Sequence, residues 1–226
     1  MRAVRVAVLG AGSLRCGPHV ASALAQWKPD DLVDIFLWDA NEERLDLFDR
    51  LLRRFLDVAD TRHTVTSSSE DFDILKSSSA VIASLHEDCC RRLLGLRRAA
   101  LFTHEEPFLT GDPNKPTPPD KLSLSSQNIL SIPVDPYTAR EDTLKLARDK
   151  LSSLLDPNAR ILNLTRGMDW PGSMSLNWPK ALDGQESEIL PHQVLRWIQG
   201  SEPATAILEL GLSSPVCEWL KNLESA

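Results

Sequence analysis

Two glycines near the amino end of the chain have the spacing of a turn that binds phosphate groups. An apolar run over residues 4–9 leads directly into Gly10 and Gly12. Gly10 permits a tight turn after a strand, and Gly12 lets the backbone come close to a pyrophosphate. A following helix would direct its unpaired N–H groups and its positive dipole end at those phosphates. Glycine turns end many strands, so these two residues alone are weak evidence for a nucleotide site.

An acidic residue further along the chain strengthens this interpretation. A second apolar run ends on Asp39. In a dinucleotide-binding βαβ unit, a carboxylate at the tip of the second strand accepts hydrogen bonds from the adenosine ribose. The order of strand, glycine turn, helix, strand and acid therefore predicts dinucleotide binding. Because Asp39 would repel a 2′-phosphate, we expect NAD in preference to NADP.

The glycine turn departs from the usual fingerprint at one position. The third glycine is replaced by Arg15, whose bulk prevents the closest packing of a helix on the strand, so we expect the helix to begin later, at Gly17 and Pro18. The longer phosphate loop would then contain Ser13, Leu14 and Arg15, which we assign to the cofactor site. Arg15 either pairs with a phosphate or a substrate anion, or is an ordinary solvated loop arginine, and the sequence leaves both alternatives open.

Two clusters of polar residues could carry other chemistry. The segment 86–90, His-Glu-Asp-Cys-Cys, follows an apolar run and would lie at the edge of a parallel sheet where ligands bind. We interpret it as a solvated helix start, with Glu87 and Asp88 complementing the helix dipole, and expect no metal site because no second ligand cluster has suitable spacing. His-Glu-Glu at 104–106 could transfer protons but lies beside a proline in a predicted loop. The catalytic residues remain unassigned.

Strands and helices must alternate to position these residues. Apolar runs of strand length occupy five segments, at 4–9, 32–39, 80–85, 160–165 and 204–210, and a short polar segment at 63–66 is interpreted as a sixth strand. Helical periodicity occurs at 18–27, 42–59 with Asn41 as the cap, 89–99, 141–155, 191–199 and a terminal segment with Trp219. This order predicts an α/β fold, a doubly wound, mostly parallel, six-stranded Rossmann sheet in three layers, α/β/α.

The length fits one domain over residues 1–226. We expect a first nucleotide-binding half at 1–100, a proline-rich loop at 107–136, and a second half at 137–226 that ends in a short helix. Four of the six tryptophans fall in the last quarter of the chain, at Trp170, Trp178, Trp197 and Trp219. Core packing is the favoured interpretation, and a homo-oligomer or partner-chain interface is the alternative.

Composition excludes several classes of partner. A net charge of −7 without a long basic run disfavours nucleic acid and anionic membranes. No apolar segment has the length of a membrane span, and the amino end lacks a signal pattern, so we expect a cytoplasmic protein. The four cysteines fit neither a disulfide framework nor a paired zinc motif, so we expect reduced thiols.

Four segments carry a resemblance to a known family. They are GAGSLR at 10–15, LWDANEERL at 37–45, SAVIASL at 79–85 and ILNLTRG at 161–167. Together they resemble the cofactor domain of the NAD-dependent glycoside hydrolases of family 4 and of the related lactate/malate dehydrogenase superfamily. The resemblance covers residues 1–100 well and 157–213 loosely. The resemblance implies that NAD is the cofactor. It also implies that Ala83, Ser84 and Asn163 lie beside the bound NAD.

The hydrolytic part of that family's pattern is missing. In the family, bound NAD oxidises a sugar hydroxyl, and a divalent metal held by Cys and His polarises the oxygens. Here Ser213 stands where the metal-binding cysteine is expected, and Arg166-Gly167 replaces an Asn-Pro pair. Little chain follows the last predicted strand, where the family has its large catalytic domain. We therefore expect a retained cofactor domain without glycosidase activity.

Three alternatives for the function remain. The chain could be an NAD-dependent oxidoreductase that acts on an unknown small molecule, with hydride transfer near Ser84 and Asn163. It could instead be a non-catalytic module that senses the cofactor or binds a partner. An S-adenosylmethionine-dependent methyltransferase shares the glycine turn, but Leu9 rather than an acid precedes the glycines here, which disfavours it.

Overall fold

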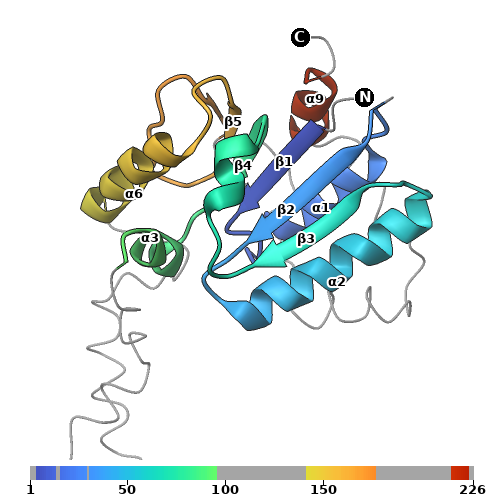
Figure 1. Cartoon of the computed structure of the whole chain (residues 1–226), viewed down its shortest axis with the longest axis horizontal. Helices are drawn as coiled ribbons and strands as arrows, with labels where there is room; N and C mark the ends of the chain where they lie inside the picture. The colour runs from blue at the N-terminus through green and yellow to red at the C-terminus, as the bar shows by residue number, and fades with distance from the viewer. Residues whose placement is uncertain (1–3, 14–15, 30, 96–140, 177–214, 224–226) are drawn as a thin grey trace, which may run out of the picture.

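The computed structural model describes residues 4–13, 16–29, 31–95, 141–176 and 215–223 (Figure 1). Its sheet has six parallel strands in the order β3-β2-β1-β4-β5-β6. The strands are β1 (Val4–Leu9), β2 (Val33–Trp38), β3 (Thr64–Ser68), β4 (Ala80–Ala83), β5 (Arg160–Asn163) and β6 (Met174–Ser175). This order places the switch between the two halves of the sheet between β1 and β4, as in doubly wound nucleotide-binding folds. The predicted α/β Rossmann architecture is confirmed.

The described helices begin within a few residues of the predicted positions, but the helix predicted at 89–99 ends at Leu93, because the chain turns at Gly95 with a φ of +66°. The helices are α1 (Gly17–Gln26), α2 (Glu42–Ala59), α3 (Glu87–Leu93), α6 (Glu141–Leu154) and α9 (Pro215–Lys221), with a 3-10 turn η1 (Asp73–Ser77) before β4. Asn41 caps α2 as predicted, because its Oδ1 accepts a hydrogen bond of 3.1 Å from the Arg44 N–H. The predicted strand at 204–210 and helix at 191–199 lie outside the described residues. The sixth strand of the described sheet, β6, was not predicted.

Both faces of the sheet are covered, which explains the continuous apolar runs of its strands. Alternate residues of each strand point to opposite faces: Val6 and Val8 pack in one cluster with α1, α2 and α9, and Ala7 and Leu9 in another with α3 and α6. Within α2, Phe55 is buried in the first cluster, and its truncation to alanine would cost about 3–5 kcal/mol. This packing holds α2 on one face of the sheet.

Two of the four C-terminal tryptophans belong to this core. Trp170 packs with α3 and α6, and Trp219 packs with α1 on the opposite face. Each is 4% exposed, so core packing is confirmed for these two side chains. Trp178 and Trp197 lie outside the described residues. No helix within the described ranges is long and apolar enough to cross a membrane.

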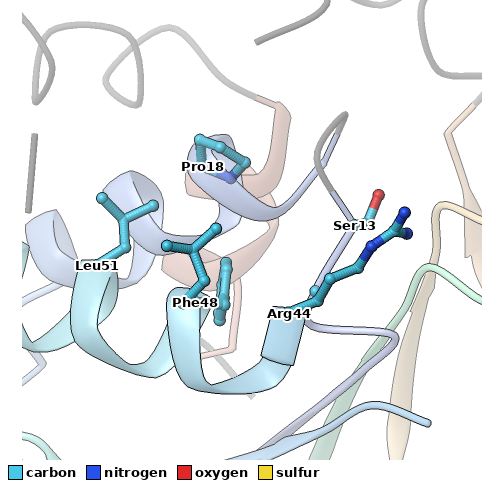
Figure 2. Close-up of a pocket in the computed structure, with 7 residues that line it drawn as sticks. Ser13, Pro18, Arg44, Phe48 and Leu51 are labelled. Atoms are coloured by element: carbon cyan, nitrogen blue, oxygen red, sulfur yellow. The ribbon is translucent and has the colours of Figure 1, made fainter. Parts of the chain in front are cut away.

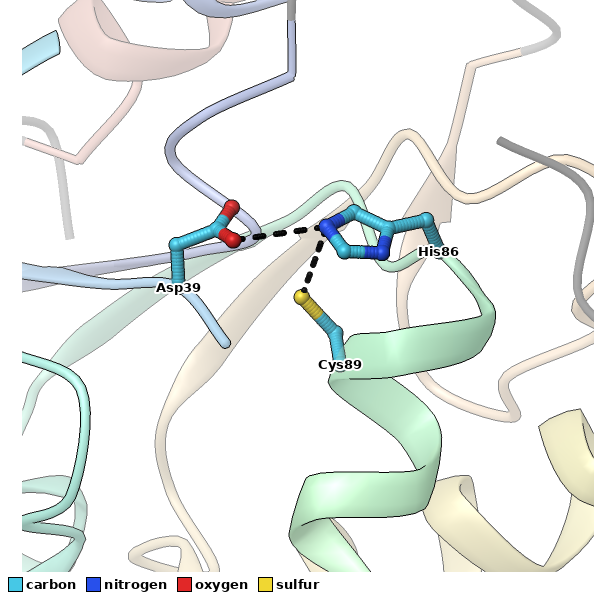
Figure 3. Close-up of side chains that lie close together, drawn as sticks. All are labelled: Asp39, His86 and Cys89. Atoms are coloured by element: carbon cyan, nitrogen blue, oxygen red, sulfur yellow. Dashed lines mark hydrogen bonds and ion pairs between the residues drawn. The ribbon is translucent and has the colours of Figure 1, made fainter. Parts of the chain in front are cut away.

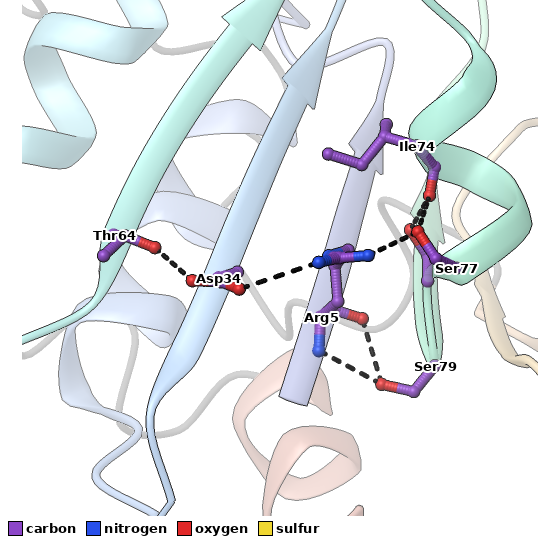
Figure 4. Close-up of polar contacts among 7 residues, drawn as sticks. Arg5, Asp34, Thr64, Ile74, Ser77 and Ser79 are labelled. Carbon is purple, nitrogen blue, oxygen red and sulfur yellow. Dashed lines mark hydrogen bonds and ion pairs between the residues drawn. The ribbon is translucent and has the colours of Figure 1, made fainter. Parts of the chain in front are cut away.

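Polar side chains at the amino ends of the strands pair with one another (Figure 4). The Arg5 guanidinium lies 4.0 Å from Asp34 and also donates to the Ser77 hydroxyl, while the Thr64 hydroxyl donates to Asp34. The Ser79 hydroxyl contacts the backbone N–H and carbonyl of Arg5. Exposed ion pairs contribute little to stability. The buried polar side chains Asp39, His86, Asn163 and Thr165 lie at or just beyond the opposite, carboxyl ends of the strands.

Candidate functional site

The ends of four strands form a level row at the carboxyl edge of the sheet. Leu9 of β1 pairs in register with Trp38 of β2 and with Ala83 of β4, and Ala83 pairs with Asn163 of β5. The residues that follow, including Gly10, Asp39 and Ser84, therefore come together at the switch point. The structure thus brings the described residues that the sequence assigned to the cofactor to one edge of the sheet, with Asn163 on the far side of β4 from Gly10 and Asp39.

Gly10 occupies a position that only glycine can fill. Its φ is +72°, in the left-handed region, and a Cβ there would lie 2.0 Å from the Ser84 carbonyl oxygen. The Gly10 and Ala11 N–H groups donate to the Trp38 carbonyl at 2.8 and 3.0 Å. Gly10 therefore holds the turn against both neighbouring strands, as its predicted role in a tight turn requires.

Gly12 allows the loop to approach the start of α2. A Cβ at Gly12 would lie 2.5 Å from the Arg44 Cβ and 3.0 Å from Asp39 Oδ2. The Gly12 N–H donates to Asp39 Oδ2 at 2.8 Å. The sequence assigned the space at Gly12 to a pyrophosphate, and in the structure Asp39 and Arg44 lie in this space.

The first helix begins late, as the missing third glycine predicts. α1 starts at Gly17, where a Cβ would lie 2.9 Å from the Ala11 carbonyl oxygen and from the Phe48 ring. Gly17 thus provides the close helix packing that the third glycine usually gives. Ser13 closes the turn, since its carbonyl accepts from the Gly17 N–H at 2.7 Å and its hydroxyl accepts from the Cys16 N–H at 3.3 Å.

The loop leaves two predicted cofactor residues outside the described part. Leu14 and Arg15 are in this position, and their assignment stays a prediction. The N–H groups of Gly10, Ala11, Gly12 and Ser13 all donate within the chain. Within the described residues 10–13, the predicted N–H groups are therefore already engaged by the chain itself.

A small pocket beside this loop adds a cation that the sequence analysis did not single out. Gly12, Ser13 and Arg44 line it together with Pro18, Leu47, Phe48 and Leu51. Figure 2 shows the Arg44 side chain extending from the first turn of α2 toward Ser13. Its position three residues after the Asn41 cap could have identified it, because the first turn of this helix must face the glycine loop.

Asp39 is a buried, hydrogen-bonded carboxylate at the tip of β2. It has no exposed surface. Besides the Gly12 contact, its Oδ1 accepts from the Asn41 N–H at 2.8 Å, and His86 Nε2 lies 3.4 Å from the same oxygen. These contacts satisfy the buried carboxylate and fix the relative positions of the glycine loop and α2.

The segment 86–90 differs from its interpretation as a solvated helix start. Glu87 and Asp88 are partly exposed, but His86 is 5% exposed and Cys89 is fully buried. The His86 ring turns inward, and its Nε2 lies 3.2 Å from Cys89 Sγ. Burial, and next the nearby Asp39, raise the pKa of the Cys89 thiol well above its usual value.

Asn163 holds the end of β5 in place. Its Nδ2 donates to the Met168 carbonyl at 2.7 Å, and its Oδ1 accepts from the Thr165 N–H at 3.0 Å. The Thr165 hydroxyl in turn accepts from the Leu85 N–H at 2.9 Å. Thr165, which the sequence analysis did not select, therefore ties the end of β4 to the connection after β5.

Comparisons with known proteins give distant similarities to solved structures. No family model matches the chain, and no curated protein matches it. A 6-phospho-alpha-glucosidase from gut microorganisms, in complex with NAD and Mn²⁺, is 13% identical with a TM-score of 0.42, covering 73% of this chain and 33% of that one. A Thermotoga maritima 6-phospho-beta glucosidase with NAD and glucose-6-phosphate is 18% identical with a TM-score of 0.40, covering 73% of this chain and 34% of that one. Lactate dehydrogenase from Eimeria maxima with NADH and oxamate is 17% identical with a TM-score of 0.41, covering 74% of this chain and 37% of that one. The chain thus spans about a third of the length of these proteins.

Proposed function

We propose that this chain binds a dinucleotide, NAD, across the carboxyl edge of its sheet. One observation supports this above the others: the glycine turn and an acid at the tip of the neighbouring strand are hydrogen-bonded to each other at the topological switch point. In open parallel sheets, ligands bind in the crevice at that point. The solved structures named above contain NAD or NADH, which agrees with this proposal, but the proposal does not rest on their similarity.

Several residues around this edge could each contact one part of such a cofactor. The turn at Gly10 and Gly12 has no room for side chains, and it leads into α1, whose N-terminus favours anions. We assign the pyrophosphate to the loop at Ser13, Leu14 and Arg15. The Gly12 and Asn41 N–H groups each use one lone pair of the Asp39 carboxylate. Asp39 would accept a hydrogen bond from the adenosine ribose with one of the remaining lone pairs. Because Asp39 has no exposed surface, a neighbouring group must move first, and we propose that this group is the His86 ring, whose Nε2 lies 3.4 Å from Asp39 Oδ1.

Arg44 would bind a phosphate oxygen beside this loop. Its side chain extends toward Ser13 and lines the same pocket. A guanidinium donates hydrogen bonds to phosphate in a fixed planar arrangement, and such charge-assisted contacts are among the strongest in proteins. Asp39 opposes a 2′-phosphate on the ribose by charge, so we propose NAD rather than NADP.

The other half of the cofactor would extend along Ala83, Ser84 and Asn163. Hydride transfer by an NAD-dependent oxidoreductase would occur here, but none of these three side chains transfers protons at neutral pH. They therefore support a cofactor-sensing or interaction module better than an enzyme. We also propose a cytoplasmic location, because all four cysteines are free thiols.

Isothermal titration tests this function. We expect the wild type to bind NAD at least about tenfold more tightly than NADP, and not to bind S-adenosylmethionine. Arg44→Gln should weaken NAD binding about tenfold or more, since a hydrogen bond to a charged group contributes about 1.5–3 kcal/mol. Arg50→Gln is the matched control, because Arg50 lies on the same helix but is exposed and does not line the pocket. Absence of binding to either dinucleotide would contradict the proposal, and equal affinities would contradict the NAD preference.

A further inference from the structure

Three buried side chains with metal-binding atoms meet above the end of β1 (Figure 3). Asp39 comes from the tip of β2, His86 from the residue before α3, and Cys89 from the first turn of α3. A carboxylate oxygen, His86 Nε2 and Cys89 Sγ all lie within 4.8 Å of one another. Asp39 and Cys89 have no exposed surface, and His86 is 5% exposed. The three ligand types therefore converge on one point without solvent around them.

The spacing of these atoms fits a tetrahedral ion. Zinc binds nitrogen and oxygen at about 2.0–2.2 Å and sulfur at about 2.3 Å, so tetrahedral ligand atoms lie about 3.3–3.6 Å apart. His86 Nε2 is 3.2 Å from Cys89 Sγ and 3.4 Å from Asp39 Oδ1. Two edges of the tetrahedron are thus formed to within a few tenths of an ångström before any ion binds.

Hydrogen bonding alone does not account for this arrangement well. Both contacts of the His86 ring converge on Nε2, and a neutral imidazole nitrogen carries either one proton or one lone pair. If Nε2 accepts a proton from the Cys89 thiol, it cannot donate to Asp39 Oδ1. If it donates, a single proton is shared between sulfur and oxygen. One metal ion would satisfy all three atoms at once.

The surroundings resemble those of metal ligands in other proteins. Ligating carboxylates are themselves held by hydrogen bonds, which orient them toward the ion. Asp39 has two such bonds, from the Gly12 N–H at 2.8 Å and the Asn41 N–H at 2.8 Å. A thiolate, an imidazole and a carboxylate favour Zn²⁺, whereas Mg²⁺ and Ca²⁺ prefer oxygen ligands only.

We propose that Asp39, His86 and Cys89 form a zinc site in which the chain supplies these three ligands. The ion would join the end of β2 to the start of α3 across the carboxyl end of β1, and so hold the crevice of the switch point closed. None of these three residues is the one at which the resemblance places the family's metal ligand, position 213. The zinc site does not depend on the proposed cofactor binding, because no dinucleotide takes part in it.

Metal titration without any dinucleotide tests this proposal. The full chain is stripped with a chelator and titrated with Zn²⁺ against a chromogenic competitor, and with Co²⁺ to detect the charge-transfer absorption that a thiolate ligand produces. We expect one ion per chain and thiolate-to-cobalt absorption. Cys89→Ser should lower zinc affinity about 100-fold and abolish that absorption, and His86→Gln should lower affinity at least about tenfold.

The neighbouring cysteine provides the control. Cys90 is equally buried on the same helix, but it is not among the three converging residues, so Cys90→Ser should keep both zinc affinity and the cobalt spectrum. Serine at position 89 can still hydrogen-bond to His86, so the variant should fold, which far-ultraviolet circular dichroism verifies. A wild type that binds no zinc, or equal losses in Cys89→Ser and Cys90→Ser, would overturn the site.

Discussion

Replacing Asp39 by alanine should destabilise the folded chain even when no cofactor is present. The carboxylate accepts two hydrogen bonds of 2.8 Å, from the Gly12 N–H and the Asn41 N–H. A hydrogen bond to a charged group contributes about 1.5–3 kcal/mol, so the two bonds give about 3–6 kcal/mol. Water entering the vacated space would recover part of this. We expect the free energy of unfolding to fall by about 2–4 kcal/mol, which corresponds to a decrease in Tm of roughly 5–15 °C for a domain of this size.

Urea denaturation followed by circular dichroism measures this effect. The matched control is Asp34→Ala, on the same strand, whose half-exposed carboxylate lies 4.0 Å from Arg5. This exposed pair should contribute less than about 1 kcal/mol. An Asp39→Ala variant as stable as the wild type would refute the structural role that we give to this carboxylate.

Four further results are expected. Gly10→Ala should lower the free energy of unfolding by about 3 kcal/mol or more, because its Cβ would lie 2.0 Å from the Ser84 carbonyl oxygen. The control Gly172→Ala, also at positive φ but in open space, should lower it by only about 1–2 kcal/mol. Equal losses of the two variants in urea melts would contradict this. Burial lowers the pKa of His19 and His63, so the unfolded chain binds more protons than the folded chain below pH ~6.5. Their contribution to stability is therefore fully present above that pH, and the free energy of unfolding should fall as the pH drops further. In His63→Gln, the urea midpoint should depend less on pH than in the wild type. All four cysteines are buried, and burial raises the pKa of Cys90 to about 12. Iodoacetamide at neutral pH should therefore label the cysteines only after the chain is unfolded in urea. Rapid labelling of the native chain would contradict this. Zinc that holds His86 on Asp39 should weaken NAD binding in titrations of the wild type but not of Cys89→Ser, and an unchanged wild-type affinity would exclude this linkage.

Local signals made the first half of the fold predictable. The apolar runs that became β1 and β2 are buried on both faces, and the apolar stripe of α2 repeats at helical spacing after a capping Asn41. Arg15 at the third glycine position correctly moved the start of α1 to Gly17. These features depend on neighbours in sequence, which is why the pattern alone identified them.

The missed features depend on contacts between distant segments. β6 is only two residues long, Met174–Ser175, so it has no periodicity to detect. His86 and Cys89 lie three positions apart, as one turn of a helix requires, but their partner Asp39 comes from another strand. Only the level ends of β2, β1 and β4 bring these three side chains together, and their burial could not be inferred from a segment rich in charge.

A crystal structure of the chain with NAD would test the central claim most directly. We predict the pyrophosphate at the loop from Ser13 to Arg15, an Arg44 contact to a phosphate oxygen, and an adenosine ribose hydroxyl within hydrogen-bond distance of Asp39. The His86 ring should be displaced from its position 3.4 Å from Asp39 Oδ1. Crystals grown at saturating NAD with no cofactor at the switch point, or with NAD bound elsewhere on the chain, would contradict the account.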